Sequence, residues 1–179
     1  DVLMVVELQN EAGADLILNN ALNVNGITEY QRANFVSSPG GGLNNMFFYR
    51  SDKMTLFEQD EIPTNLRDIG KYTVLMNDPN LSVHQDPTYI DFYVAHLKAN
   101  NTEADEDSRT QTCTILQNYI NNQPAARNAI IGGDFNVYRS TEDAYQILLS
   151  GNDPFFDPID TPGNWHINFN FRAIHTQST

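Results

Sequence analysis

The stretch Ala129–Asn136, AIIGGDFN, decides the fold. An apolar run leads into two glycines and then into Asp134, Phe135 and Asn136, which predicts a buried strand over Ala129–Phe135. A carboxylate at the end of so apolar a strand is costly unless it has a partner. The glycines are compatible with a closely approaching ligand and equally with tight strand packing, and Asn136 could simply form an Asx-turn.

Two further apolar strands end in residues that an enzyme could use. Val2–Leu8 (VLMVVEL) carries Glu7, and Tyr89–Leu97 (YIDFYVAHL) carries His96. Ligands of α/β sheets gather at the carboxyl ends of strands, where the rigid sheet fixes the side chains. Taken singly, a Glu at a strand end is usually solvated and a lone His is more often structural, so only the combination indicates a site.

The remaining pattern predicts a mixed-sheet α/β domain. Further strands are expected over Met46–Arg50, Met54–Glu61 and Tyr72–Met76, with 72–97 forming a long hairpin. Helices are expected over Glu11–Leu22, from a Thr102–Asp105 capping box to about Asn121, and in a short segment capped by Ser140 or Thr141 and ended by Gly151. No repeat or linker interrupts residues 1–179, which predicts a single domain.

Composition limits the function. The 179 residues carry a net charge of −13 with only ten basic residues, which disfavours strong binding to a nucleic-acid backbone unless a cation bridges the acids to phosphate or other parts of the protein bind it. Composition alone favours a small phosphorylated substrate. The single cysteine, Cys113, excludes an intramolecular disulfide and a Cys-based zinc site, and we expect a buried thiol. No apolar run approaches the roughly 18 residues of a membrane span.

Glu7, His96, Asp134 and Asn136, in this order, resemble the endonuclease/exonuclease/phosphatase superfamily, whose members include deoxyribonuclease I, apurinic endonucleases, neutral sphingomyelinases and inositol-polyphosphate 5-phosphatases. The resemblance covers nearly the whole chain through DVLMVVEL, MFFYRSDKM, FYVAHLKA and IIGGDFNVYRS. It implies the deoxyribonuclease I-like four-layer α/β/β/α sandwich, here incomplete. The GGDEF motif of diguanylate cyclases and the calcineurin-like metallophosphatases are weaker matches, because the further acids or histidines that they need are missing.

The resemblance also implies roles for individual residues. Glu7 would bind Mg²⁺, with Mn²⁺ or Ca²⁺ as substitutes, and Asp134 would orient the attacking water. Asn136 would bind a phosphate oxygen, and His96 would contact the phosphate or the leaving group. Lys98, on the same strand face as His96, and Arg50 are candidates for substrate binding.

The implied function is that of a magnesium-dependent phosphoester hydrolase, with a nuclease-like phosphodiesterase ranked first and nucleic acid among the candidate substrates. The alternatives are a lipid or small-molecule phosphatase and a non-catalytic binding module; no obligate protein partner is indicated. The family's first strand with its Asn and its final S-D-H triplet are not found in the sequence, so we expect a chain cut from a longer precursor and inactive alone. His175 is not in an S-D-H context, so the general-base role is not assigned to it, and we expect His166 and His175 to line a loop near the site or to serve structure. The ending FRAIHTQST is most similar to secreted bacterial members, which implies a secreted or periplasmic protein.

Overall fold

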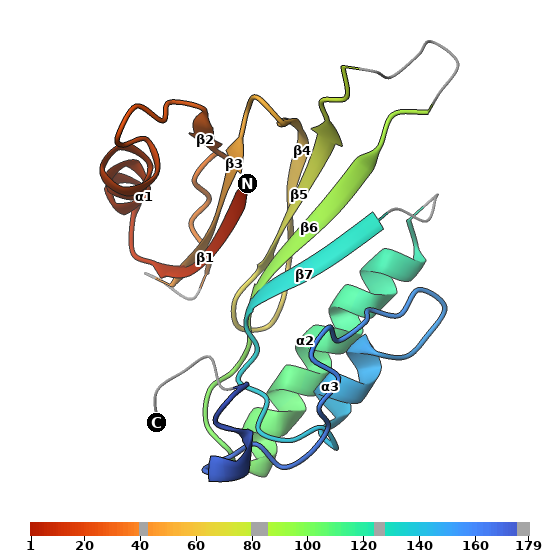
Figure 1. Ribbon diagram of the computed structural model, residues 1–179. Coiled ribbons are helices and arrows are strands. Elements are labelled where there is room, and N and C mark those ends of the chain that lie inside the picture. Colours follow the sequence, from red (N-terminus) through yellow and green to blue (C-terminus); the bar gives the residue numbers. More distant parts are fainter. Residues whose placement is uncertain (40–42, 80–85, 124–127, 175–179) are drawn as a thin grey trace. The chain divides into compact units, whose positions relative to one another are not determined.

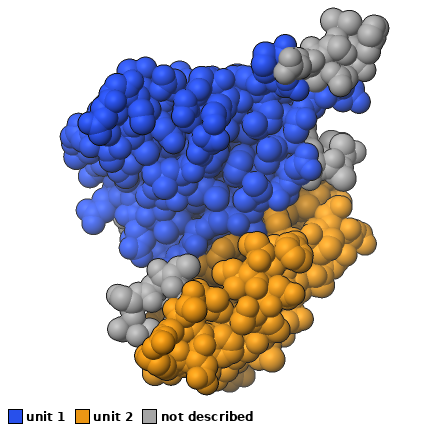
Figure 2. Space-filling model, viewed as in Figure 1, with its two compact units in different colours: residues 1–96, 125–134 blue, residues 97–124, 135–179 orange. Residues whose placement is uncertain are grey.

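The chain forms two compact units in a computed structural model that describes residues 1–39, 43–79, 86–123 and 128–174 (Figure 1). Unit 1 comprises Asp1–His96 and Ala125–Asp134, and unit 2 comprises Leu97–Pro124 and Phe135–Thr179 (Figure 2). The chain therefore passes from unit 1 into unit 2 directly after His96 and again directly after Asp134. The expectation of a single domain stays a prediction.

Unit 1 contains two β-sheets. The first is antiparallel, in the order β1-β3-β2, and is built from β1 (Val2–Leu8), β2 (Tyr30–Arg32) and β3 (Asn44–Arg50). The second has the order β4-β5-β6-β7, and its strands are β4 (Met54–Ile62), β5 (Ile69–Met76), β6 (Tyr89–His96) and β7 (Asn128–Asp134). Its first three strands are antiparallel, including the expected hairpin of β5 and β6, whereas β6 and β7 run parallel.

Strand β3 explains how the layers of unit 1 are held together. Successive strand residues point to opposite faces, and both faces of β3 are buried. Phe47 and Tyr49 join a core with residues of the second sheet, including Tyr72, which stacks on Phe47 at 4.8 Å between ring centroids. Met46 and Phe48 pack on the other side, in the cluster that contains helix α1 (Glu11–Ile17) and the π-helix η1 (Leu18–Leu22). Unit 1 is thus a helix, a sheet and a second sheet in succession (Figure 1).

Unit 2 contains helix α2 (Glu103–Asn121), helix α3 (Asp143–Leu148) and the short 3-10 helix η2 (Phe169–Phe171). The predicted capping box of α2 is confirmed, with Thr102 and Asp105 bonded reciprocally. Cys113 is buried as expected, and burial raises the pKa of its thiol to about 12. The predicted cap of α3 by Ser140 or Thr141 is wrong. Its N-cap residue is Glu142, whose carboxylate bonds to other partners and makes no cap hydrogen bond.

The predicted strands and the mixed α/β class are confirmed. Strand β2 was not predicted, because three residues are too few to show a period. Among the described residues, no helix is both long and apolar enough to cross a bilayer.

Candidate active site

Glu7 lies at a β-bulge near the end of β1. The pairing with β3 advances three residues along β1, from Val5 to Leu8, against two along β3, from Met46 to Asn44. Glu7 has φ of +62°, a left-handed conformation that a non-glycine residue rarely adopts. A bulge redirects a side chain, and strained backbone concentrates at functional sites. The Glu7 carboxyl is 61% exposed and is therefore available to a ligand.

His96 and Asp134 lie at the adjacent carboxyl ends of two parallel strands. They are register partners at the ends of β6 and β7. The Nε2 atom of His96 is 3.6 Å from Oε1 of Glu7. Unit 1 therefore brings together Glu7, His96 and Asp134, three of the residues singled out from the sequence.

The imidazole of His96 is kept neutral. Its side chain is only 3% exposed, and burial is the main reason that its pKa is lowered from 6.5. The positive charge of Arg67 lowers the pKa further, whereas Asp134 and Glu7 oppose the shift. Nδ1 is buried and has no hydrogen-bond partner among the residues that the structure describes. At neutral pH, His96 can therefore donate one N–H hydrogen bond and carries no charge.

Arg67 is a cation of this site that sequence reasoning missed. Its Nη1 donates to the carbonyl oxygen of His96 at 3.1 Å, and its charge interacts with Glu7 and Asp134. The loop before β5 holds it in place, because the Thr64 hydroxyl donates to the Arg67 carbonyl and accepts from the Arg67 N–H. The polar loop 63–68 has no period, so nothing in the sequence distinguished Arg67 from the other basic residues.

Asn45 was also missed. It is a buried residue of β3 whose Nδ2 donates to the carbonyl oxygens of Asp68 and Val94, at 2.9 and 3.0 Å. It thus fastens the Arg67 loop to the end of β6. The sequence did contain one indication of its role, because Asn45 is a polar residue directly before the apolar run MFFYR.

The two glycines before Asp134 serve close packing. A Cβ on Gly133 would collide with the backbone carbonyl of Ala95 in β6, and Gly133 has φ of +137°. A Cβ on Gly132 would meet the side chain of Met4. Of the two readings left open by the sequence, tight strand packing accounts for both residues.

Asn136 and Lys98 belong to unit 2. Asn136 has φ of +48°, and its Nδ2 donates to the carbonyl oxygen of Leu97 at 3.2 Å. The Lys98 ammonium forms an ion pair with Asp105 at 2.9 Å and donates to the carbonyl oxygen of Ala99. Each residue follows a strand-end residue of unit 1 by two positions in the chain.

Arg50 does not join the cluster around Glu7. It ends β3 beside Asp1, to whose carbonyl its N–H donates, whereas Glu7 is near the opposite end of β1. Its guanidinium is bonded to Asp52 through two hydrogen bonds of 2.9 and 2.7 Å. In unit 2, the exposed His166 packs edge-on against Tyr138, and His175 is outside the described residues.

The carboxylates near His96 suit a metal ion that needs few protein ligands. Within the described ranges, no three His, Cys, Asp or Glu residues form a cluster of the kind that encloses a metal. Mg²⁺ does not need such a cage, because it keeps several waters and is commonly bound by one or two carboxylates. The exposed Glu7 carboxylate, with Asp134 nearby in the same unit, fits this weaker requirement.

The fold has clear counterparts among solved structures. The human Nocturnin catalytic domain with bound sulfate matches with a TM-score of 0.58 and 21% identity, over 84% of this chain and 56% of that one. A D. rerio TDP2 humanized by 14 mutations matches with a TM-score of 0.57 and 18% identity, over 82% and 56%. The Bacteroides thetaiotaomicron mannosyl-6-phosphatase Bt3783 matches with a TM-score of 0.53 and 14% identity, over 82% and 55%.

The chain has the deoxyribonuclease I-like fold. The fold that the sequence resemblance implied is thereby confirmed. No protein-family model matches the sequence. No curated protein matches it either. The chain spans only slightly more than half of the deoxyribonuclease I-like structures above.

Proposed function

We propose that the protein containing this chain is a metal-dependent phosphoester hydrolase, and more narrowly a phosphodiesterase. The observation that carries the proposal is the meeting of Glu7, His96 and Asp134 at strand ends, with the Nε2 atom of His96 3.6 Å from the Glu7 carboxylate. Arg67 adds a positive charge beside both carboxylates. This combination suits phosphoester hydrolysis, because donors and cations can stabilise the negative charge that develops on the phosphoryl oxygens as water attacks.

The residues of the chain take distinct roles in this proposal. Glu7 would hold Mg²⁺ or Mn²⁺, which when bound would neutralise charge on the phosphoryl group. Asp134 would accept a hydrogen bond from the attacking water and so aim it at phosphorus. The new P–O bond forms as the ester P–O bond breaks, and the leaving oxygen takes up a proton.

Two neutral donors would act on the phosphoryl oxygens. His96 carries an N–H donor rather than a charge, since its lowered pKa keeps it neutral, and it would stabilise a phosphoryl or leaving oxygen. Asn136 would donate its amide to a non-bridging oxygen. The ion pair of Lys98 with Asp105 means that any contact of Lys98 with phosphate would be shared with that carboxylate.

Nucleic acid is the substrate that we rank first. A D. rerio TDP2 structure of this fold, with a TM-score of 0.54 and 15% identity, contains a single-strand DNA product. The mannosyl-6-phosphatase of the same fold supports a small phosphomonoester as the second candidate. The net charge of −13 makes the second candidate worth testing in parallel.

The test uses the full-length protein with plasmid DNA, bis-p-nitrophenyl phosphate and p-nitrophenyl phosphate, each with Mg²⁺, with Mn²⁺ and with EDTA. We expect turnover of the diesters that EDTA abolishes. D134A and N136A should each lower the rate by on the order of 10²-fold, as for the loss of one preorganised group. D107N, which removes an exposed charge from α2, is the matched control and should retain full activity. Absence of metal-dependent turnover on every substrate would refute the proposal.

A further inference from the structure

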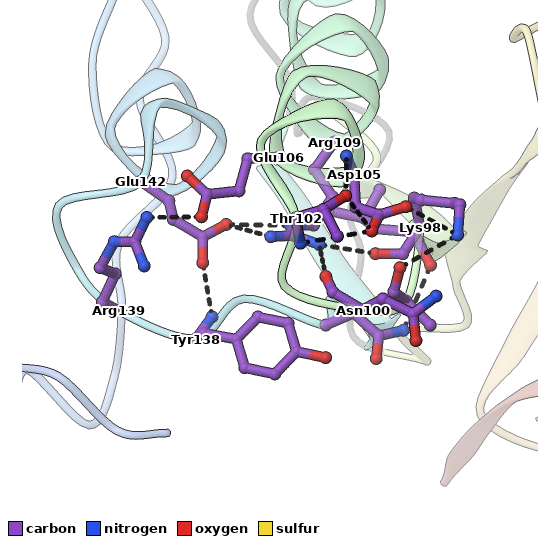
Figure 3. A network of polar contacts seen from close by, with 12 residues as sticks. Lys98, Asn100, Thr102, Asp105, Glu106, Arg109, Tyr138, Arg139 and Glu142 are labelled. Carbon is purple, nitrogen blue, oxygen red and sulfur yellow. Dashed lines mark hydrogen bonds and ion pairs between the residues drawn. The ribbon is translucent and has the colours of Figure 1, made fainter. Parts of the chain in front are cut away.

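A buried ion pair in unit 2 joins the two loops that follow β6 and β7. Arg109 of α2 is fully buried, and Glu142, directly before α3, is 3% exposed. The Nε and Nη2 atoms of Arg109 lie 2.9 and 2.8 Å from Oε2 of Glu142 (Figure 3). Both partners are therefore withdrawn from water, where a charge is stable only if its hydrogen bonds are replaced.

One side of the pair holds the loop that follows β6. The Nη1 atom of Arg109 donates to the carbonyl oxygens of Lys98 and Asn100, both at 2.8 Å. Asn100 has φ of +76°, so the loop turns sharply at this anchor. This loop carries Lys98 and begins at Leu97, whose carbonyl oxygen accepts a hydrogen bond from the Asn136 side-chain amide.

The other side holds the loop that follows β7. The Oε1 atom of Glu142 accepts from the backbone N–H of Tyr138 at 2.8 Å. The guanidinium of Arg109 lies over the Tyr138 ring, 5.3 Å from its centroid. Asn136 is two residues before Tyr138, so the pair fixes the segment that presents the Asn136 side chain.

Two flanking ion pairs repeat the pattern at the start of α2. Asp105 pairs with Lys98 of the first loop at 2.9 Å, and Glu106 pairs with Arg139 of the second at 2.5 Å (Figure 3). These pairs are partly exposed, and pairs of that kind contribute little to stability. The buried pair is the one contact of this group, among the described residues, that reaches both loops.

A buried ion pair is weak evidence for stability, because apolar residues of similar volume often do as well. What apolar residues cannot replace is the set of hydrogen bonds to Lys98, Asn100 and Tyr138. We propose that Arg109 and Glu142 are positioning residues, which hold the loop of Lys98 and the loop of Asn136 in the register that phosphoester hydrolysis requires. This inference rests on the proposed function. Its distinctive claim is that the buried ion pair keeps both loops conformationally ordered.

The test compares Arg109→Met with Gln117→Met in the full-length protein. Gln117 is a matched control, since it is also buried on α2 and donates to two backbone carbonyls, those of Ser150 and Asp153, at 3.3 and 3.2 Å. Both variants should be less stable. In hydrogen–deuterium exchange, only Arg109→Met should lose protection over 97–101 and 135–139, and its kcat on bis-p-nitrophenyl phosphate should fall by about 10- to 100-fold, the cost of a misplaced group. Gln117→Met should retain the wild-type kcat.

The double variant R109M/E142L separates positioning from stability. Replacing both charges with apolar groups should restore much of the stability that Arg109→Met loses. Hydrogen–deuterium exchange in both loops should stay fast and kcat should stay low, because the carbonyls of Lys98 and Asn100 and the N–H of Tyr138 still lack the hydrogen bonds that the ion pair supplied. Recovery of kcat in the double variant, or unchanged exchange in Arg109→Met, would overturn the inference. An inactive wild type would refute the proposed function instead, and loop exchange would then decide whether the pair anchors the loops.

Discussion

The imidazole of His96 and the carboxylate of Glu7 approach to 3.6 Å although β6 and β1 belong to different sheets of unit 1. The two sheets share a core that contains Phe47, Tyr72 and Val94, so the ends of the strands are fixed by packing rather than by the polar contact itself. The distance exceeds that of a normal hydrogen bond. The carboxylate consequently keeps its oxygens available to a ligand while its charge still acts on the imidazole.

The strained backbone at Glu7 predicts that stability and activity oppose each other there. Glu7→Gly should stabilise the protein by about 0.5–1 kcal/mol, because glycine adopts positive φ without the cost that other residues bear. Glu7→Gln keeps the strain and should leave stability nearly unchanged, while both variants should lose metal-dependent hydrolysis. Urea unfolding and diester turnover measure the two effects.

A helical position supplies the control for Glu7→Gly. Asp107→Gly, on an exposed face of α2, should destabilise by roughly 0.3 kcal/mol, the difference between the helix propensities of Asp and Gly. A Glu7→Gly variant that is destabilised to the same extent would show that the φ of Glu7 carries no strain.

The neutral state of His96 predicts a loss of stability in acid. Its pKa is lowered from 6.5 by burial and by Arg67, so the unfolded chain takes up the proton first. The stability from this residue is fully present above about pH 6.5 and decreases as pH falls toward the lower folded-state pKa. Urea unfolding in EDTA should therefore show that the free energy of unfolding decreases less from pH 7.5 to 5.5 for His96→Asn than for the wild type. His166→Asn, at an exposed histidine of unit 2, is the control substitution.

The sequence predicted the parts of the site that follow from strand pattern. Glu7, His96 and Asp134 each end an apolar strand, and parallel or adjacent strand ends in one α/β unit bring such residues close together. The bulge between Val5 and Leu8 could not be predicted, because it depends on pairing with β3, some 40 residues away in the chain.

The supporting contacts escaped prediction for a different reason. Arg109 and Glu142 are 33 residues apart, and each is of a type that usually lies on a solvated surface. Their burial arises only when the loops after β6 and β7 fold against α2. Arg67 was missed likewise, since its role depends on the His96 carbonyl and not on local sequence.

The two glycines before Asp134 should differ in how much a substitution by alanine destabilises the protein. Gly133→Ala should destabilise by about 3 kcal/mol or more, because its Cβ would collide with the Ala95 carbonyl and φ is +137°. Gly132→Ala meets only the flexible side chain of Met4 and should cost about 1 kcal/mol. Thermal unfolding of the two variants provides the comparison. Equal stability would mean that the β6–β7 backbones are not as close as the structure has them.

Removing the charge of Glu61 should raise the free energy of unfolding. Burial, aided by Asp68 and Asp60, raises the pKa of the Glu61 carboxyl from 4.5 to about 7. The folded state therefore holds a proton between these values that the unfolded chain has lost, so stability falls as pH rises from 4.5 to 7 and the penalty is complete above 7. Glu61→Gln should be more stable than the wild type by about 1 kcal/mol at pH 8, a figure reduced for partial solvent screening, and should show little difference at pH 4.5.

The acidic net charge makes a control necessary for Glu61→Gln. Removing any negative charge from a chain of net charge −13 reduces repulsion in the folded state. Asp107→Asn removes one charge from an exposed position of α2, and its effect at pH 8 measures this general contribution. Urea unfolding at pH 8 and 4.5 should show a larger gain for Glu61→Gln than for Asp107→Asn. Equal gains would trace the effect to net charge and would contradict a raised pKa at Glu61.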